Sequence, residues 1–118
     1  MAGEPWGVRL ERIGRAVIVA PSGRLDASGA DRLREVLMSR AGDYDMVVLD
    51  LRDLAFVDAA GVELIVEQEL RGHEVGFDLA VVPGAVAREA LADADVEITL
   101  VDDPFEILEP HRARGRTP

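Results

Sequence analysis

The hydrophobic and polar positions near the start of the chain follow a two-residue period before a helical period takes over. Residues 8–11 alternate apolar and polar side chains, which predicts a half-buried strand. Residues 16–20 form a continuous apolar run that predicts a buried strand, and the Gly-Arg pair at 14–15 predicts a hairpin turn between the two strands. We expect Pro21-Ser22-Gly23 to end the second strand.

The next segment carries the spacing of an amphipathic helix. Ser28 stands three residues before Asp31, as in a capping box, and apolar side chains follow at positions 30, 33, 36 and 37. This pattern predicts a helix over about residues 29–40, ended by Gly42. The nearly unbroken apolar run at 46–51 predicts a strand covered on both faces, and a second short apolar run follows at 54–57.

The second half of the chain continues to alternate strand and helix patterns. Asp58 is placed to cap a helix over about residues 60–71, with the apolar side chains at 62, 65, 66 and 70 facing inward and Gly72 closing the helix. The pattern then predicts a strand at 77–82, a short helix at 85–91 and a fourth parallel strand at 97–101. Asp102 or Asp103 would cap a last helix running to about residue 109.

Strands that alternate with helices after an opening hairpin predict an α/β sandwich. We expect a mixed sheet of four to five strands, in which an N-terminal hairpin is followed by parallel strands, together with about four helices. The domain would span residues 7–110, after a flexible N-terminus at 1–6. Residues 111–118 contain three arginines and no acidic residue, which predicts a disordered basic tail.

Composition and charge narrow the functional classes. The 118 residues contain no cysteine and no lysine, which excludes disulfide bonds, a thiol nucleophile and a P-loop lysine. The formal net charge of −10 makes nucleic acid and an anionic membrane poor partners. Because the apolar runs are far shorter than a membrane span and no secretion signal is apparent, we expect a cytoplasmic protein.

Few residues suggest catalytic chemistry. Asp50, Asp53 and Asp58 lie close together in the sequence, and such carboxylates can bind magnesium. Structural roles fit them better, with Asp58 as a helix cap and the other two as loop or surface charges. The serines form no grouping with a histidine and an acid, so we expect no enzyme activity, no metal and no cofactor.

The segment from residue 57 to residue 62 is the most informative. An apolar strand end runs into an acidic cap, then into small residues, then into an amphipathic helix. Free backbone amides in a first helical turn attract anions, and small side chains let another molecule approach closely. The segment therefore suggests a partner-binding surface, although tight packing between a strand and a helix explains small residues as well.

Two segments carry a resemblance to a known family. The first is Pro21-Ser22-Gly23-Arg24-Leu25-Asp26-Ala27, followed by Leu33 and Leu37. The second is Val47-Val48-Leu49-Asp50-Leu51-Arg52-Asp53-Leu54-Ala55-Phe56-Val57-Asp58-Ala59-Ala60-Gly61-Val62. Over about residues 7–109, the sequence resembles the STAS domain family, and within it the single-domain bacterial anti-sigma factor antagonists. The resemblance implies a STAS-type sandwich.

The resemblance implies a regulatory module that binds an anti-sigma factor with a histidine-kinase-like ATPase fold and so releases a sigma factor. In such antagonists the kinase phosphorylates the serine after the motif's aspartate, which breaks the complex. Here Ala59 occupies that phospho-acceptor position and Ala60 follows it, so neither offers a hydroxyl group. Glu63 stands where the family often has a small residue. The residues implied to contact the partner are Asp26, Asp58, Ala59, Ala60, Gly61, Val62 and Glu63.

Two interpretations follow from these departures. In the first, the protein is a constitutive antagonist that binds its anti-sigma factor kinase whether or not ATP is present. In the second, it is a divergent STAS scaffold, or a subunit of a transport or stress-signalling complex outside the sigma pathway. The acidic residues Asp26 and Asp58 favour the first interpretation. A homodimer is compatible with both.

Overall fold

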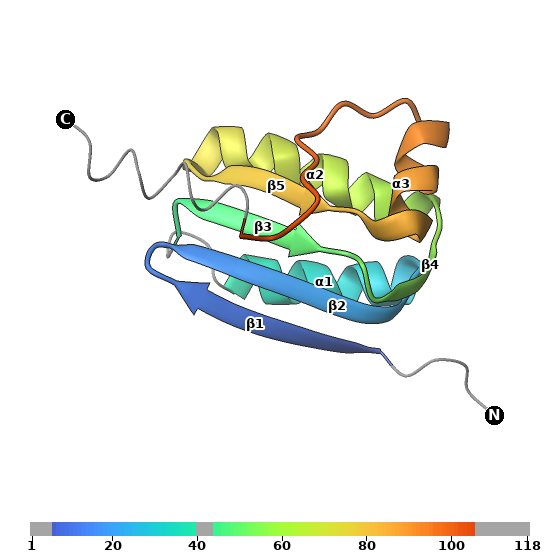
Figure 1. Cartoon of the computed structure of the whole chain (residues 1–118), viewed down its shortest axis with the longest axis horizontal. Helices are drawn as coiled ribbons and strands as arrows, with labels where there is room; N and C mark the ends of the chain where they lie inside the picture. Colours follow the sequence, from blue (N-terminus) through green and yellow to red (C-terminus); the bar gives the residue numbers. More distant parts are fainter. Residues whose placement is uncertain (1–5, 40–43, 106–118) are drawn as a thin grey trace.

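The computed structural model describes residues 6–39 and 44–105. These residues form a five-stranded mixed sheet with helices packed against it, which confirms the predicted α/β fold (Figure 1). In chain order the elements are β1 (Gly7–Ile13), β2 (Ala16–Leu25), α1 (Ala27–Ser39), β3 (Met46–Asp50), β4 (Leu54–Val57), α2 (Ala59–Val75), β5 (Asp78–Val82) and α3 (Gly84–Asp93).

The sheet has the strand order β1-β2-β3-β5, and β4 pairs with the far end of β2. β1 and β2 form the predicted antiparallel hairpin, whereas β2–β3, β3–β5 and β2–β4 are parallel pairs. Each parallel step needs a crossover connection, and α1 and α2 provide two of them. The hairpin followed by parallel strands is therefore confirmed.

The prediction that Pro21-Ser22-Gly23 ends the second strand is wrong, because β2 continues to Leu25. The first half of β2 pairs with β3, and its last residues, Gly23 to Leu25, pair with β4. The register shifts between Gly23 and Arg24, where Gly23 adopts a φ of 96°. The proline and glycine thus mark the point where the strand changes neighbours.

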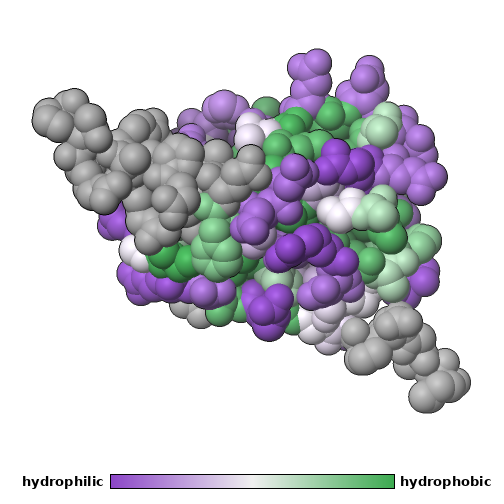
Figure 2. Space-filling model, viewed as in Figure 1, coloured by the Kyte–Doolittle hydropathy of each residue, from purple (hydrophilic) through white to green (hydrophobic). Residues whose placement is uncertain are grey.

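The two faces of the sheet are covered differently. α1 and α2 lie side by side over one face of the sheet (Figure 1). There, buried leucines of both helices pack against side chains of β2, β3 and β5. The other face carries a second, smaller cluster of buried side chains, among them Ile18 and Met46, and Val101 packs against it. Figure 2 looks onto this second face, where green hydrophobic areas are broken up by purple hydrophilic residues.

The structure corrects the predicted start of α1 and the predicted end of α2. α1 begins at Ala27, so Ser28 lies inside the first turn and is not the cap. α2 runs on to Val75, and its cap is Gly76, whose φ of 97° lies in the left-handed region that glycine favours. Gly72 lies within α2, where a Cβ atom would come within 2.6 Å of the Phe77 carbonyl oxygen. This glycine is therefore required for packing and does not end the helix.

The strand predicted at 97–101 is reduced to a single parallel bridge between Val81 and Leu100. The Val81 N–H donates to the Thr99 carbonyl at 2.9 Å, and the Val101 N–H donates to the Val81 carbonyl at the same distance. The last predicted helix lies mostly outside the described residues; within them, residues 102–105 form a turn. The described residues contain three helices, against about four expected. Apart from Trp6, which packs against the core, the N-terminal and C-terminal segments also lie outside them.

Candidate functional site

Two helix starts meet at one end of the sheet. Leu25, the last residue of β2, pairs with Val57, the last residue of β4. Asp26 and Asp58 follow these residues directly, and the Asp58 N–H donates to the Leu25 carbonyl at 3.3 Å. Parallel strands that end together thus bring the starts of α1 and α2 next to each other, as Figure 1 shows near the label of β4.

Asp58 caps α2 as the sequence predicts. Its Oδ1 atom accepts hydrogen bonds from the Ala60 N–H at 2.9 Å and the Gly61 N–H at 3.3 Å. Its backbone is extended, as expected for a residue that precedes the first helical turn. The carboxylate therefore occupies two of the free amides of this helix start, and these amides are not open to an external anion.

Asp26 caps α1 in the same way. The sequence pattern had predicted that Ser28 would be this cap. The Asp26 Oδ1 atom accepts a hydrogen bond from the Gly29 N–H at 3.0 Å. This bond lowers the pKa of Asp26, and the nearby Arg24 guanidinium, 3.5 Å away, adds to the effect. Aspartate is as good an N-cap as serine, so the signal was present in the sequence and was assigned to the wrong residue.

A glycine in the first turn lets each helix approach β2 closely. At Gly61 a Cβ atom would lie 2.6 Å from the Leu25 carbonyl oxygen. At Gly29 it would meet the Arg24 carbonyl oxygen at a still shorter separation. Both atoms belong to the backbone, so neither contact can be relieved by rotating a side chain. Gly61 is therefore a packing residue rather than a surface residue.

The implied contact residues at the start of α2 divide by exposure. Ala59 and Glu63 are exposed, Ala60 and Asp58 are half-buried, and Gly61 and Val62 are buried. The exposed methyl group of Ala59 and carboxylate of Glu63 therefore define the surface that an approaching molecule meets first. Gly61 lies in the contact between α2 and β2, and its lack of a side chain lets the start of α2 sit close to the end of β2.

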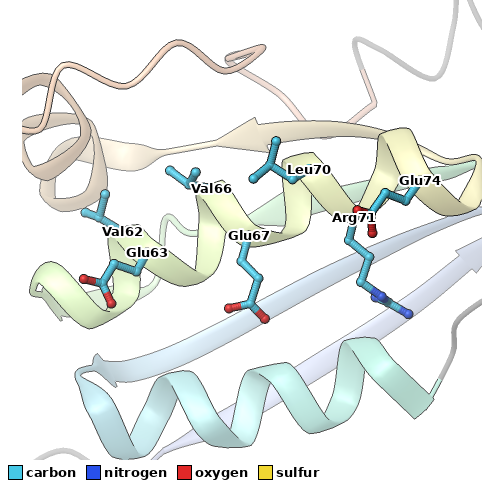
Figure 3. Close-up of a pocket in the computed structure, with 7 residues that line it drawn as sticks. All are labelled: Val62, Glu63, Val66, Glu67, Leu70, Arg71 and Glu74. Carbon is cyan, nitrogen blue, oxygen red and sulfur yellow. The ribbon is translucent and has the colours of Figure 1, made fainter.

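An apolar groove of about 540 Å³ extends from this surface along the outer face of α2. Figure 3 shows one row of apolar side chains and a second, charged row that points toward α1. The apolar row includes Leu70, which is 60% exposed although the sequence predicted that it faces inward. The lining residues are Val62, Glu63, Val66, Glu67, Leu70, Arg71 and Glu74.

The sequence pattern did not predict the groove, because α2 has two rows of apolar side chains on neighbouring faces. The inner row includes Leu64 and Ile65, which are fully buried, and also Gln68, which is 1% exposed. A polar residue on the inner row and a leucine on the outer row blur the single-face pattern that periodicity detects. The usable signal was the four-residue spacing of Val62 and Val66, which continues to Leu70 on a face next to the buried one.

The groove is bordered by negative charge. Glu67 accepts two hydrogen bonds from Arg34 of α1, at 2.8 and 3.2 Å, so its charge is balanced locally. Within the described residues, Glu63 and Glu74 have no ion-pair partner. Arg71 also lines the groove, so the groove's unpaired charges are two carboxylates against one guanidinium. An apolar row beside this net negative charge suits a partner that presents apolar side chains next to lysine or arginine.

The three clustered aspartates do not form a common site. The prediction that Asp50 is a loop or surface charge is wrong, because it ends β3 and is 5% exposed. Burial raises its pKa, but the hydrogen bonds from Arg52, at 2.9 and 2.8 Å, and the Arg52 charge outweigh burial and leave the pKa lowered. Asp53 lies 3.8 Å from Arg9, and Asp58 caps α2. No group of three histidine, cysteine, aspartate or glutamate side chains in residues 6–39 and 44–105 is placed to hold a metal ion.

Comparison with known proteins identifies the fold. The family model for the STAS domain matches residues 8–103. No curated protein sequence matches the chain. Among the helices of the described segments, none is long and apolar enough to cross a membrane.

Several solved structures have the same architecture. The anti-sigma factor antagonist SpoIIAA in its unphosphorylated form has a TM-score of 0.71 and 19% identity, over 92% of this chain and 99% of its own. An anti-sigma factor antagonist from Mycobacterium paratuberculosis has a TM-score of 0.77 and 20% identity, over 92% and 95% of the two chains. The Thermotoga maritima protein TM1081 has a TM-score of 0.75 and 21% identity, over 89% and 94%.

Proposed function

The chain belongs to the STAS domain family, and we propose that it acts as an anti-sigma factor antagonist in the bacterial cytoplasm. Its partner would be an anti-sigma factor with a histidine-kinase-like ATPase fold, and binding would release a sigma factor. The observation that carries this proposal is the exposed, aspartate-capped start of α2, which opens directly into the groove. The names of the similar structures support the same general role.

The contact surface in this proposal runs from Ala59 and Glu63 along the groove to Leu70. The small Ala59 side chain allows close approach, and the apolar row gives the partner an area that loses contact with water on binding. Glu63 supplies a negative charge at a position where the family often has a small residue. We therefore expect a positively charged contact residue on the partner.

The proposed interaction is constitutive. Ala59 stands in the phospho-acceptor position that the resemblance assigns, and Ala60 follows it, so this helix start offers no hydroxyl group to a kinase. A phosphate group there would add about 1.5–2 negative charges beside Asp58 and Glu63, and its size and cost of desolvation would disrupt a closely packed contact at Ala59. Without that switch, the concentrations of the two proteins would control the amount of complex.

Titration calorimetry tests the proposal directly. The purified chain would be titrated with each histidine-kinase-like anti-sigma factor encoded in its source genome, with ATP or ADP present. We expect one of them to bind equally well with either nucleotide, and mass spectrometry to find no phosphate on the chain. Binding to none of these factors would contradict the proposal, and co-purification with transporter or stress-complex subunits would then favour the scaffold interpretation.

A substitution at the acceptor position tests the constitutive part. Ala59→Ser should become a substrate of the bound kinase with ATP and should then lose affinity for it. Ala85→Ser is the matched control, because Ala85 is also exposed in the first turn of a helix, here α3, away from the groove. If Ala59→Ser stays unmodified while bound, the kinase assignment of the partner is wrong.

A further inference from the structure

β1 leaves one edge of the sheet open. It is the end strand in the order β1-β2-β3-β5, and no strand of the described part of the chain pairs with its outer edge. All seven residues from Gly7 to Ile13 pair with β2 without a register shift, so the edge is long and regular. Natural proteins usually protect such an edge with a proline, a bulge or charges that oppose pairing. β1 has neither a proline nor a bulge, so its charges decide what it can pair with.

We propose that β1 pairs antiparallel with β1 of a second copy of this chain, around a two-fold axis at Leu10. This register places Arg9 of each copy opposite Glu11 of the other. The two charges alternate along the strand, so one antiparallel pairing produces two opposite-charge contacts. The inference is independent of the function proposed above.

The neighbouring registers are disfavoured by charge. In an antiparallel pair that continues the sheet and keeps the helices of both copies on one side, the two-fold axis is perpendicular to the sheet. It passes midway between the two copies of one residue, which therefore lie opposite each other. An axis at Arg9 would set Arg9 against its own copy, and an axis at Glu11 would set Glu11 against its own copy. Like charges placed directly opposite destabilise a strand pair, whereas opposite charges stabilise it. Of the axes at residues 9, 10 and 11, the one at Leu10 avoids both clashes and sets opposite charges against each other.

The side chains of β1 are oriented to support this pairing. Arg9 and Glu11 lie opposite Ala20 and Ile18 of β2, so both point to the sheet face that α1 and α2 do not cover. The Arg9 side chain is 74% exposed and its contact with Asp53 is 3.8 Å long, which leaves it free to turn toward the new edge.

On the opposite face of β1, the proposed pairing forms an apolar contact between the two copies and places no like charges opposite each other. Leu10 lies opposite Val19 on the helix face and is 41% exposed, so two copies would cover each other's leucine. Arg12 shares this face, where its guanidinium lies 5.4 Å from the centre of the Tyr44 ring. In the proposed register Arg12 faces Val8 of the second copy, so it meets no like charge.

The proposed dimer keeps the α2 groove accessible. β1 is the edge beside β2 and α1, whereas α2 packs on α1 and β5 toward the other edge (Figure 1). Joining two sheets through β1 therefore leaves one groove open at each end. A dimer of this kind could hold two partner molecules, or bind a dimeric partner at both sites.

Sedimentation velocity of the full chain over a wide concentration range is the first test. We expect the mass to rise from the monomer value of 12.8 kDa toward twice that value as the concentration increases. A mass that stays at the monomer value up to millimolar concentration would overturn the proposal.

Charge exchange tests the register. Arg9→Glu and Glu11→Arg should each raise the dissociation constant about tenfold or more, because each sets like charges opposite one another. The double variant Arg9→Glu with Glu11→Arg exchanges the two charges and should recover most of the wild-type affinity. Arg88→Glu on α3 is the matched control and should leave dimerisation unchanged. Weak dimers in all three edge variants, or in none, would overturn the proposed register.

Cross-linking provides a second, independent measurement. The chain has no cysteine, so Leu10→Cys introduces a single thiol on the proposed axis. Directly opposite residues of antiparallel strands have Cα atoms about 4.5–5.5 Å apart, within the range that a disulfide spans. We expect Leu10→Cys to form a disulfide-linked dimer rapidly under mild oxidation, and Met38→Cys on α1 to do so slowly. Equal rates for the two variants would contradict the pairing.

Discussion

The starts of α1 and α2 are built on the same plan. Each follows a strand end at the same edge of the sheet, and each has an aspartate cap that binds a first-turn amide. Each also contains a glycine that allows contact with the end of β2. This shared construction serves the fold, because it satisfies free amides and lets both helices cover one sheet face.

The two helices differ in what they present to the outside. Trp6 lies over the start of α1, within 3.1 Å of the position a Gly29 Cβ atom would occupy. The start of α2 exposes Ala59 and Glu63 and continues into the groove. Capping and close packing therefore do not identify the functional surface, since both helices have them. The apolar row on α2, which becomes exposed from Val66 to Leu70, does distinguish the two.

The largest expected change in stability tests the close packing of both helix starts against β2. Gly29→Ala and Gly61→Ala would each place a methyl group against a backbone carbonyl, and we expect a loss of about 2–3 kcal/mol in the free energy of unfolding. In an unconstrained helix interior the same change would stabilise the protein by about 1 kcal/mol, so the sign is diagnostic. Urea denaturation measures the effect, with Ser28→Ala as a control that stays near wild type. Wild-type stability in either glycine variant would contradict the close approach.

The next effect tests the difference between the outer faces. Leu70→Ala should weaken binding to the proposed anti-sigma factor partner about tenfold, because Leu70 is the largest apolar side chain that lines the groove and burial of a leucine side chain contributes about 1.5–3 kcal/mol. Met38→Ala on α1 is the matched control, since Met38 is also large, apolar and about half exposed. Calorimetry measures both affinities. If the two variants bind equally well, the groove is not part of the contact surface.

A smaller effect compares the two caps. Asp58→Ala should cost about 1 kcal/mol of unfolding free energy, the usual cost of losing an N-cap. Asp26→Ala should cost less, because Asp58 binds two amides and Asp26 binds one. Thermal and urea unfolding measure the order of the two losses. A larger loss at Asp26 would show that its carboxylate has another role.

The order of elements and the cap at Asp58 followed from sequence patterns, because both depend on contacts close in the chain. The ends of two elements did not follow from such patterns. Gly72 and Gly76 both have the sequence signature of a helix end, and α2 passes the first and ends before the second, whose φ is 97°. Pro21 has the signature of a strand end, yet β2 continues because β4, some thirty residues later, supplies a second neighbour.

The candidate site was predicted in part. Residues 58–63 were identified from local spacing and from the resemblance, and the structure shows which of them are exposed. The groove depends on how α2 is rotated against the sheet, and this rotation depends on the packing of Gln68 and Leu64 in the core. The role of Asp50 was missed for a similar reason, because its burial depends on neighbouring strands.

The smallest expected effect concerns the pH dependence of the α1 start. The folded pKa of Asp26 is lowered by the Gly29 amide, so the unfolded chain takes up this proton first as the pH falls. The stabilising contribution is therefore fully present above the unfolded value of about 3.9 and is lost as the pH falls through the folded pKa.

Asp26→Asn should accordingly lose less stability than wild type on acidification, while Ser28→Ala should follow the wild-type curve. Urea denaturation at a series of pH values measures this difference, and NMR titration of the Asp26 carboxyl group measures its pKa directly. A carboxyl group that titrates at or above the unfolded value would show that the Gly29 amide does not hold it in solution. The two helix starts would then differ in their caps as well as in their outer faces.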